Sequence, residues 1–208
     1  MSLHAHRIIA SHEPSRPVLT GVTVDIPPNT VVGLTGPSGS GKTTLARVLT
    51  GLHPAESGQV TVDGIPLSDA EPGAVAMLFQ SPRSAVTHRW TLERIIAEPT
   101  RSGRGRPDSV RSLATRLGLT DDLLERRPHQ VSEGQLQRAC LARALVQDPR
   151  YLICDEMTAM LDPATTAALT EVITEEARRG LGVLAISHHH ALLDAWADHT
   201  IALGAPTP

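Results

Sequence analysis

Alternating apolar and polar positions mark the first segment with a clear secondary-structure pattern. The stretch VLTGVTVDI at 18–26 alternates in this way, which predicts a half-buried strand, and the PPN after it predicts a turn. The run VVGLT at 31–35 predicts a short buried strand that leads into a glycine-rich stretch. The segment KTTLARVLTGL at 42–52 then has the apolar spacing of a helix that ends at Gly51. The predicted order is strand, loop, helix.

Later segments continue this alternation of strands and helices. Strands are predicted at QVTVDG, VAMLF, RYLICD and GVLAIS, with a last strand near HTIAL (residues 59–64, 75–79, 150–155, 182–187 and about 199–203). Helical patterns dominate 91–147, another helix covers 163–179, and a short helix precedes the final strand. Strands that alternate with helices favour a mainly parallel α/β core.

Length and charge narrow the classes of protein to consider. A chain of 208 residues is expected to form one domain, 1–208. Its net charge of -3 offers no basic surface of the kind that nucleic acids need, so no nucleic-acid partner is expected. No segment resembles a signal peptide or reaches the roughly 18 apolar residues of a membrane helix, which favours the cytoplasm. Cys140 and Cys154 fall in apolar stretches and are expected to be reduced and buried.

The glycine-rich stretch GPSGSGKTT holds the only lysine among the 19 lysines and arginines of the chain. It matches G-x-x-x-x-G-K-[ST] between a predicted strand and helix, as that phosphate-binding motif requires. Its backbone N–H groups can turn toward phosphate oxygens, and the compact ammonium of Lys42 fits where the broad guanidinium of arginine needs a wider cradle. The alternative is a glycine- and serine-rich loop without a ligand. The residues expected to bind nucleotide are Gly36, Pro37, Ser38, Gly39, Ser40, Gly41, Lys42, Thr43 and Thr44.

Two further segments carry candidate chemistry. YLICDE ends an apolar strand with two carboxylates, where Asp155 could hold Mg²⁺ and Glu156 could polarise an attacking water. The alternative is a buried strand with a solvated end. In HQVSEGQLQRACLARAL at 129–145, Ser132 and Gln135 have the spacing of a helix capping box, which an ordinary capped helix would share.

The segments GPSGSGKTT, LFQ, VSEGQLQR, YLICDE, MLD and AISH, in this order, resemble the motifs of nucleotide-binding subunits of ABC transporters. LFQSPRSAVTHRWTLERIIAEP and RRPHQVSEGQLQR resemble the ATP-binding subunits of peptide and nickel importers in particular. The resemblance covers nearly the whole chain. It implies a P-loop ATPase core with a mainly parallel sheet, an N-terminal antiparallel β portion and an inserted helical subdomain at about 85–147.

The resemblance also implies a role for each matching position. The implied catalytic residues are Lys42, Gln80, Glu156 as general base and His188 as switch histidine, and the implied Mg²⁺ ligands are Thr43, Gln80 and Asp155. Asp162 would lie at a dimer interface. The signature that contacts ATP held by the other protomer would be Ser132, Glu133, Gly134 and Gln135. Each site would then be composite, so the chain should work as a homodimer or beside a homologous second subunit.

Further partners follow from the same resemblance. The helical subdomain and the glutamine loop would dock a membrane permease, and a substrate-binding protein would deliver the cargo of an importer. The chain would then be cytoplasmic and peripheral on the inner face of the cell membrane. Two other interpretations stay open: a regulatory partner that binds ATP but hydrolyses it poorly in a heterodimeric transporter, and a soluble ABC ATPase outside transport.

Several positions depart from the family pattern, among them Met157 and Ala159, which replace the usual proline and serine after the two carboxylates. His12 aligns with a residue that is usually aromatic and stacks on adenine. Glu133 replaces the usual glycine in the middle of the signature. A carboxylate there is favoured by the helix dipole but repels a γ-phosphate at the same helix end, so it either faces the nucleotide and weakens the site or faces away toward solvent or the partner.

Three other groups of residues each allow a functional and a structural interpretation. The arginine-rich loop is either solvated or meets an anionic surface; its residues are Arg101, Arg104, Arg106 and Arg111. Three consecutive histidines, 188–190, could suggest a metal cluster, but neighbours that follow a strand point in different directions. Trp90 and Trp196 are expected to fill apolar gaps rather than to stack on a ligand.

Overall fold

The computed structural model describes residues 1–13, 16–105 and 109–204. A five-stranded parallel sheet, in the order β6-β7-β8-β3-β9, forms its centre. These strands are β3 (Val31–Thr35), β6 (Val75–Leu78), β7 (Tyr151–Asp155), β8 (Gly182–Ile186) and β9 (His199–Ala202). Every residue of β3, β7 and β8 is buried, as expected for parallel strands covered on both faces. The predicted mainly parallel α/β core is confirmed.

A second, antiparallel sheet has the order β2-β1-β4-β5. Its strands are β1 (Leu3–Glu13), β2 (Arg16–Ile26), β4 (Ser57–Val62) and β5 (Ile65–Pro66). The sequence analysis identified no strand at β1, because the apolar alternation changes phase within it. Leu3 and Ala5 are fully buried, and the next buried positions are Ile8 and Ala10, after a bulge at which Arg7 has φ 50°.

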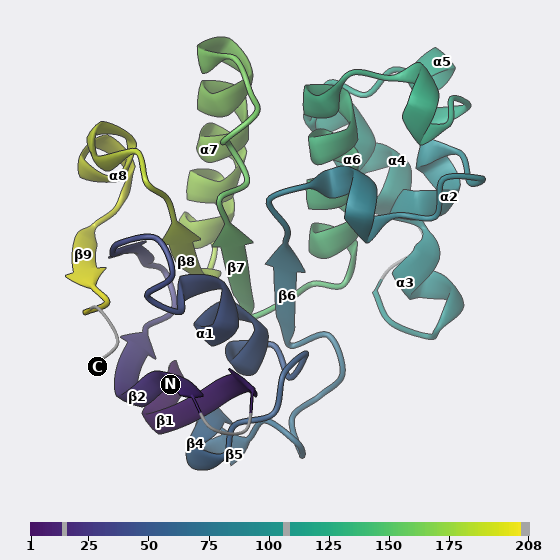
Figure 1. Cartoon of the computed structure of the whole chain (residues 1–208). Coiled ribbons are helices and arrows are strands. Elements are labelled where there is room, and N and C mark those ends of the chain that lie inside the picture. The colour runs from purple at the N-terminus through teal and green to yellow at the C-terminus, as the bar shows by residue number, and fades with distance from the viewer. Residues whose placement is uncertain (14–15, 106–108, 205–208) are drawn as a thin grey trace.

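The helices lie around the parallel sheet. Figure 1 shows α2 to α6 gathered beside β6, and the antiparallel strands at the bottom of the view below α1. The helices are α1 (Lys42–Leu49), α2 (Leu92–Ile96), α3 (Glu98–Arg101), α4 (Ser109–Arg116), α5 (Asp121–Leu124), α6 (Glu133–Val146), α7 (Pro163–Arg178) and α8 (His190–Trp196), with 3₁₀ turns η1 (Pro82–Ala85) and η2 (Pro128–Gln130).

Two hydrophobic cores meet across the parallel sheet. In β7, Leu152 and Cys154 pack into the core that contains α2, α4, α6 and α7, while Tyr151 and Ile153 pack into the core shared with α1 and the antiparallel sheet. Alternate residues of one strand therefore serve opposite faces. Both thiols are buried and free, and burial raises the pKa of Cys140 to about 11.

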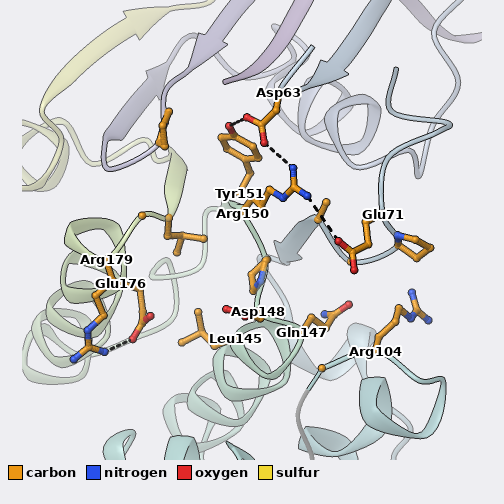
Figure 2. Close-up of a pocket in the computed structure, with 18 of the residues that line it drawn as sticks. Asp63, Glu71, Arg104, Leu145, Gln147, Asp148, Arg150, Tyr151, Glu176 and Arg179 are labelled. Carbon is orange, nitrogen blue, oxygen red and sulfur yellow. Dashed lines mark hydrogen bonds and ion pairs between the residues drawn. The ribbon is translucent and has the colours of Figure 1, made fainter. Parts of the chain in front are cut away.

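Asp63 connects the antiparallel sheet to the start of β7. Its carboxylate accepts hydrogen bonds from the Tyr151 hydroxyl at 2.6 Å and from Arg150 Nη1 at 2.8 Å (Figure 2). Burial raises the pKa of Asp63, but the hydrogen bonds from Tyr151 and Arg150 outweigh it and the net pKa is lowered. The ionised form of Asp63 is therefore favoured in the folded chain.

We expect Tyr151→Phe to lower the free energy of unfolding at pH 7 by about 1–3 kcal/mol, because a carboxylate that is mostly buried loses a hydrogen-bond donor. A lowered folded pKa stabilises the fold above the ordinary carboxyl pKa of 3.8, and this stabilisation is lost as the pH falls through the folded pKa. The difference between variant and wild type should therefore shrink below pH 3.8 in urea unfolding curves. Asp121→Asn, which removes an exposed partner of Arg111, is the control and should cost less than about 1 kcal/mol. A Tyr151→Phe deficit that stays constant with pH would contradict this account.

Candidate functional site

The loop at 36–41 joins the carboxyl end of β3 to α1 and requires glycine at two positions. Gly36 has φ 153°, and a Cβ there would lie 2.6 Å from the backbone oxygen of Leu203. Gly41 has φ 95°, and a Cβ there would lie 2.6 Å from Leu19 Cδ2. A side chain at either position would force the surrounding backbone or core to move, so these glycines fix the shape of the loop.

Lys42 spans the loop that precedes it. Its Nζ donates hydrogen bonds to the backbone oxygens of Gly36 at 2.8 Å and Pro37 at 2.9 Å, and the residue is only 5% exposed. The Ser40 hydroxyl is buried without a hydrogen bond to any described residue, and Gly41 gives the start of α1 no side-chain cap. An ammonium, an unsatisfied hydroxyl and an uncapped helix start are groups that phosphate oxygens satisfy. The residues present therefore fit a nucleotide phosphate.

Thr43, the second residue of α1, is hydrogen-bonded to Asp155 at the end of β7. The Thr43 hydroxyl donates to Asp155 Oδ1 at 3.3 Å, and Asp155 is 4% exposed. Burial raises the pKa of this carboxyl, the Thr43 hydrogen bond lowers it, and the charge of Glu156 raises it, with a net increase. A carboxylate and a hydroxyl side by side form a ligand set that suits Mg²⁺.

The carboxylate of Glu156 is held from two sides. Gln80 Nε2 donates to Oε2 at 3.0 Å, and His188 Nε2 lies 2.8 Å from Oε1. Gln80, Glu156 and His188 follow the ends of β6, β7 and β8, so three neighbouring strands deliver them to one edge of the sheet. Glu156 also has φ 48°, a left-handed conformation that costs a non-glycine residue about 1–2 kcal/mol. Strain of this kind is typical of functional positions.

A hollow of about 280 Å³ is lined by Lys42, Thr43, Glu156 and His188 but not by Gln80 or Asp155. Its lining consists of Val18, Ser38, Gly39, Gly41, Lys42, Thr43, Thr44, Glu156 and His188. None of the signature residues at 132–135, all of which are described, lines it. The structure therefore brings together the phosphate loop, the general-base candidate Glu156 and the switch-histidine candidate His188, and leaves the signature segment of the same chain outside.

A larger cavity, of about 1150 Å³, lies at the opposite edge of the sheet, where β6 and β7 begin. Dashed lines in Figure 2 join Arg150 to Asp63 and Glu71, and Arg179 to Glu176. Arg150 binds Asp63 at 2.8 Å and lies 3.7 Å from Glu71, and Arg179 lies 2.8 Å from Glu176. Both of these arginines are thus engaged by carboxylates, and the cavity lies at the opposite edge of the sheet from the phosphate loop, so it is not the nucleotide site.

The signature segment begins α6 in the predicted manner. Ser132 Oγ accepts from the Gln135 backbone N–H at 3.2 Å, and Gln135 Oε1 accepts from the Ser132 N–H at 2.9 Å. The predicted capping box is confirmed. Gly134 lies close to α7, because a Cβ there would be 2.9 Å from Thr165 Cγ2. Asp162 caps α7 by accepting from the Thr165 N–H and hydroxyl at 2.9 and 2.7 Å.

Glu133 has a partner that the sequence analysis did not foresee. Its Oε2 accepts a hydrogen bond from Arg83 Nε at 2.8 Å. Arg83 lies in η1, shortly after Gln80 in the chain. Neither of the two orientations considered from the sequence included a cation of the same chain. The sequence does contain an arginine shortly after LFQ and an acidic residue in the signature. No spacing or motif indicates that two residues 50 positions apart form a pair.

The remaining candidates have structural contacts. Trp90 packs against the helical core with the Arg94 guanidinium carbon 4.4 Å from its ring centroid, and Trp196 packs against the same core and donates to Thr174 Oγ1 at 3.0 Å. His189 Nδ1 accepts from the Leu192 N–H at 3.0 Å at the start of α8, so it and His188 serve different partners.

Two candidates lie beyond what the structure describes. Arg106 belongs to the undescribed stretch 106–108, and the side chain of His12 is likewise outside the described residues, so adenine stacking at His12 stays a prediction. Arg111 lies on α4, where it contacts Glu93 and Asp121 at 2.8 Å each.

None of the helices in the described ranges has both the length and the apolar character that crossing a membrane requires.

Comparison with known proteins agrees with this geometry. The family model described as "ABC transporter" matches residues 19–159. The nickel import ATP-binding protein NikE of Rhodospirillum rubrum is 36% identical over 208 residues, covering 94% of this chain and 75% of that protein. The oligopeptide transport ATP-binding protein OppF of Escherichia coli is 32% identical over 197 residues, covering 88% of this chain and 59% of that protein.

Solved structures show the same fold. A chain described as "Structure of ATP binding subunit of ABC transporter" superposes with a TM-score of 0.87 at 24% identity, covering 100% of this chain and 89% of that chain. The matched family region contains the phosphate loop, Gln80, the signature and the pair Asp155–Glu156. The chain therefore belongs to the ABC transporter family, whose ATP-binding cassettes are transport ATPases.

Proposed function

We propose that this chain is the ATP-binding and ATP-hydrolysing subunit that energises a membrane ABC transporter. The observation that carries the proposal is the single hollow that collects Lys42, Glu156 and His188 at the carboxyl edge of the parallel sheet. This edge is where α/β proteins bind their ligands. The family supports ATP as the nucleotide.

Residues in and beside the hollow have separate parts in the proposed reaction. Lys42 exchanges its two bonds to loop carbonyls for bonds to phosphate oxygens, while the amides at the start of α1 bind the same phosphates. Thr43, Gln80 and Asp155 would hold Mg²⁺, which neutralises charge on the phosphates.

Glu156 accepts a proton from the attacking water, and its two oxygens are oriented by Gln80 and His188. Glu156 directly follows β7 with a left-handed backbone, and it lines the same hollow as residues of the phosphate loop. Positioning of the base before substrate binds lowers the entropic cost of reaching the transition state.

A second chain completes the site in this proposal. The hollow, at about 280 Å³, is at the lower limit of ordinary ligand pockets, which hold about 300–1,000 Å³, and no signature residue lines it. Ser132, Gly134 and Gln135 of a second subunit would contact the γ-phosphate, with Asp162 near the interface. The second subunit is either another copy or a homologous chain.

The similarity to NikE and OppF supports a role in import, with nickel or peptides as the cargo class. A permease would dock on the α2–α6 region and the glutamine loop, and a substrate-binding protein would deliver the cargo. The chain would then be peripheral on the cytoplasmic face of the membrane.

The acidic residue in the signature favours one alternative, a regulatory subunit that binds ATP but hydrolyses it poorly. Glu133 places a negative charge at the helix start that would receive the partner's phosphate. The two functions differ in steady-state ATP hydrolysis. A gain of about a hundredfold in Glu133→Gly, which corresponds to about 2.7 kcal/mol in the barrier, would favour the regulatory subunit, since it would mean that Glu133 keeps the signature weak.

We expect Lys42→Ala to abolish tight ATP binding and Lys42→Arg to weaken it about tenfold or more, because the buried loop is shaped for an ammonium. Titration calorimetry with ATP and Mg²⁺ measures the effect. Arg47→Lys, an exposed change on the same helix, is the control. Near-wild-type affinity in Lys42→Arg would refute the account of the loop.

We expect Glu156→Gln to keep ATP affinity but to slow hydrolysis by about 10²–10⁴-fold, because it removes the base and keeps the shape. The variant should also accumulate an ATP-bound dimer in sedimentation velocity. Glu125→Gln, an exposed change on the helical side, is the matched control. If only monomers form with ATP and Mg²⁺, either the partner is a different chain or the composite site is wrong.

A further inference from the structure

We propose that Arg83 is a positioning residue for the signature. Its guanidinium links the segment that follows Gln80 to the start of α6. It also pairs with the Glu133 carboxylate, so that this carboxylate does not occupy the positive end of the helix. The role of the signature in contacting ATP rests on the proposed function. The contacts of Arg83, in contrast, lie within one chain and can be tested independently of that function.

All three nitrogens of the Arg83 guanidinium are engaged. Nε donates to Glu133 Oε2 at 2.8 Å, Nη1 to the Pro128 backbone oxygen at 2.8 Å, and Nη2 to the Val131 backbone oxygen at 3.2 Å. The two carbonyls precede the cap residue of α6 and the carboxylate follows it. One planar fork therefore holds both sides of the helix start, which the single ammonium of a lysine cannot reproduce.

The Arg83–Glu133 pair is partly buried. The side chains of Arg83 and Glu133 are 39% and 25% exposed. Partial burial reduces screening by water and salt, so the attraction is stronger than that of a fully exposed pair. Removing only Arg83 would leave Glu133 partly buried without its cation, which is the costly way to break such a pair.

Other contacts tie the same segment to α6. Gln137, which is 1% exposed, directs Nε2 at the Phe79 backbone oxygen at 3.5 Å. Arg143 Nη1 donates to the Ala85 backbone oxygen at 2.8 Å. Residues before and after Gln80 are thus both linked to α6, so a displacement of the glutamine segment must move the helix start or break these bonds.

The electrostatic part of the proposal concerns where Glu133 goes without Arg83. A carboxylate in the first turn of a helix is attracted by the positive helix end. In the composite site, the same end receives the γ-phosphate of the partner's nucleotide, and two negative groups there repel each other. Arg83 gives the carboxylate another partner and leaves the helix end to the phosphate.

Hydrogen–deuterium exchange on the full chain without nucleotide tests the tie itself. We expect Arg83→Gln to speed exchange of the amides at 129–136 by about tenfold, because the loop before α6 loses three bonds. Arg111→Gln removes an arginine with two surface ion pairs from the same group of helices and should leave those amides unchanged. Unchanged exchange in Arg83→Gln would overturn the proposal. Because no nucleotide is present, this result stands even if the chain proves not to hydrolyse ATP.

Steady-state kinetics test the electrostatic part, in whichever assembly hydrolyses ATP: the purified chain, or the transporter co-purified from native membranes. We expect Arg83→Gln to raise KM for ATP about tenfold with a smaller loss in kcat, and Arg83→Lys to have an intermediate effect. Adding Glu133→Gly to Arg83→Gln should return KM to within about threefold of wild type, although exchange at 129–136 stays fast. A double variant as impaired in KM as Arg83→Gln would overturn the electrostatic role and leave Arg83 as a structural contact. Absence of ATP binding by the unmodified chain would instead count against the proposed function.

Discussion

The parallel register of β3, β6, β7 and β8 is the constraint on which the rest of the structure depends. Because these strands run in one direction, the segments that follow them emerge at one edge of the sheet. The phosphate loop, Gln80, Glu156 and His188 come from four such segments, although they are widely separated in sequence. The two-faced burial of the strands keeps this edge in place, because a one-residue slip would exchange the side chains of the two cores.

Glu156 shows how the site combines strain with support. Its left-handed backbone is unfavourable by itself, yet its N–H donates to the Ile186 backbone oxygen at 3.0 Å and both its carboxylate oxygens have partners. The ammonium of Lys42 is likewise held within the hollow, because it donates hydrogen bonds to two backbone carbonyls of the phosphate loop. Contacts within the chain thus hold the charged groups of the hollow at positions from which they can transfer to phosphate or water.

The helical region relates to this site through α6. Its capped start contacts α7 at Gly134, its side chains reach the backbone on either side of Gln80, and Arg83 joins its acidic first residue to η1. The helix α6 therefore carries the signature at its start and also contacts the glutamine segment, so it connects two elements of the proposed composite site. In this arrangement the acidic residue of the signature is part of the connection between them.

The sequence by itself determined the features that depend on neighbouring residues: the glycine loop with its lysine, the buried strands, and the capped start of α6. Local periodicity reports which side of an element is buried, and local spacing reports which residues can cap a helix. It could not report the strand β1, where a bulge shifts the alternation, nor contacts between distant segments. Gln80 and Glu156 are 76 residues apart, and Arg83 and Glu133 are 50 apart. The family resemblance indicated the first pair as members of one site, but only the tertiary structure showed the second. Such contacts depend on how the strands and helices pack, because packing decides which side chains face each other across the chain.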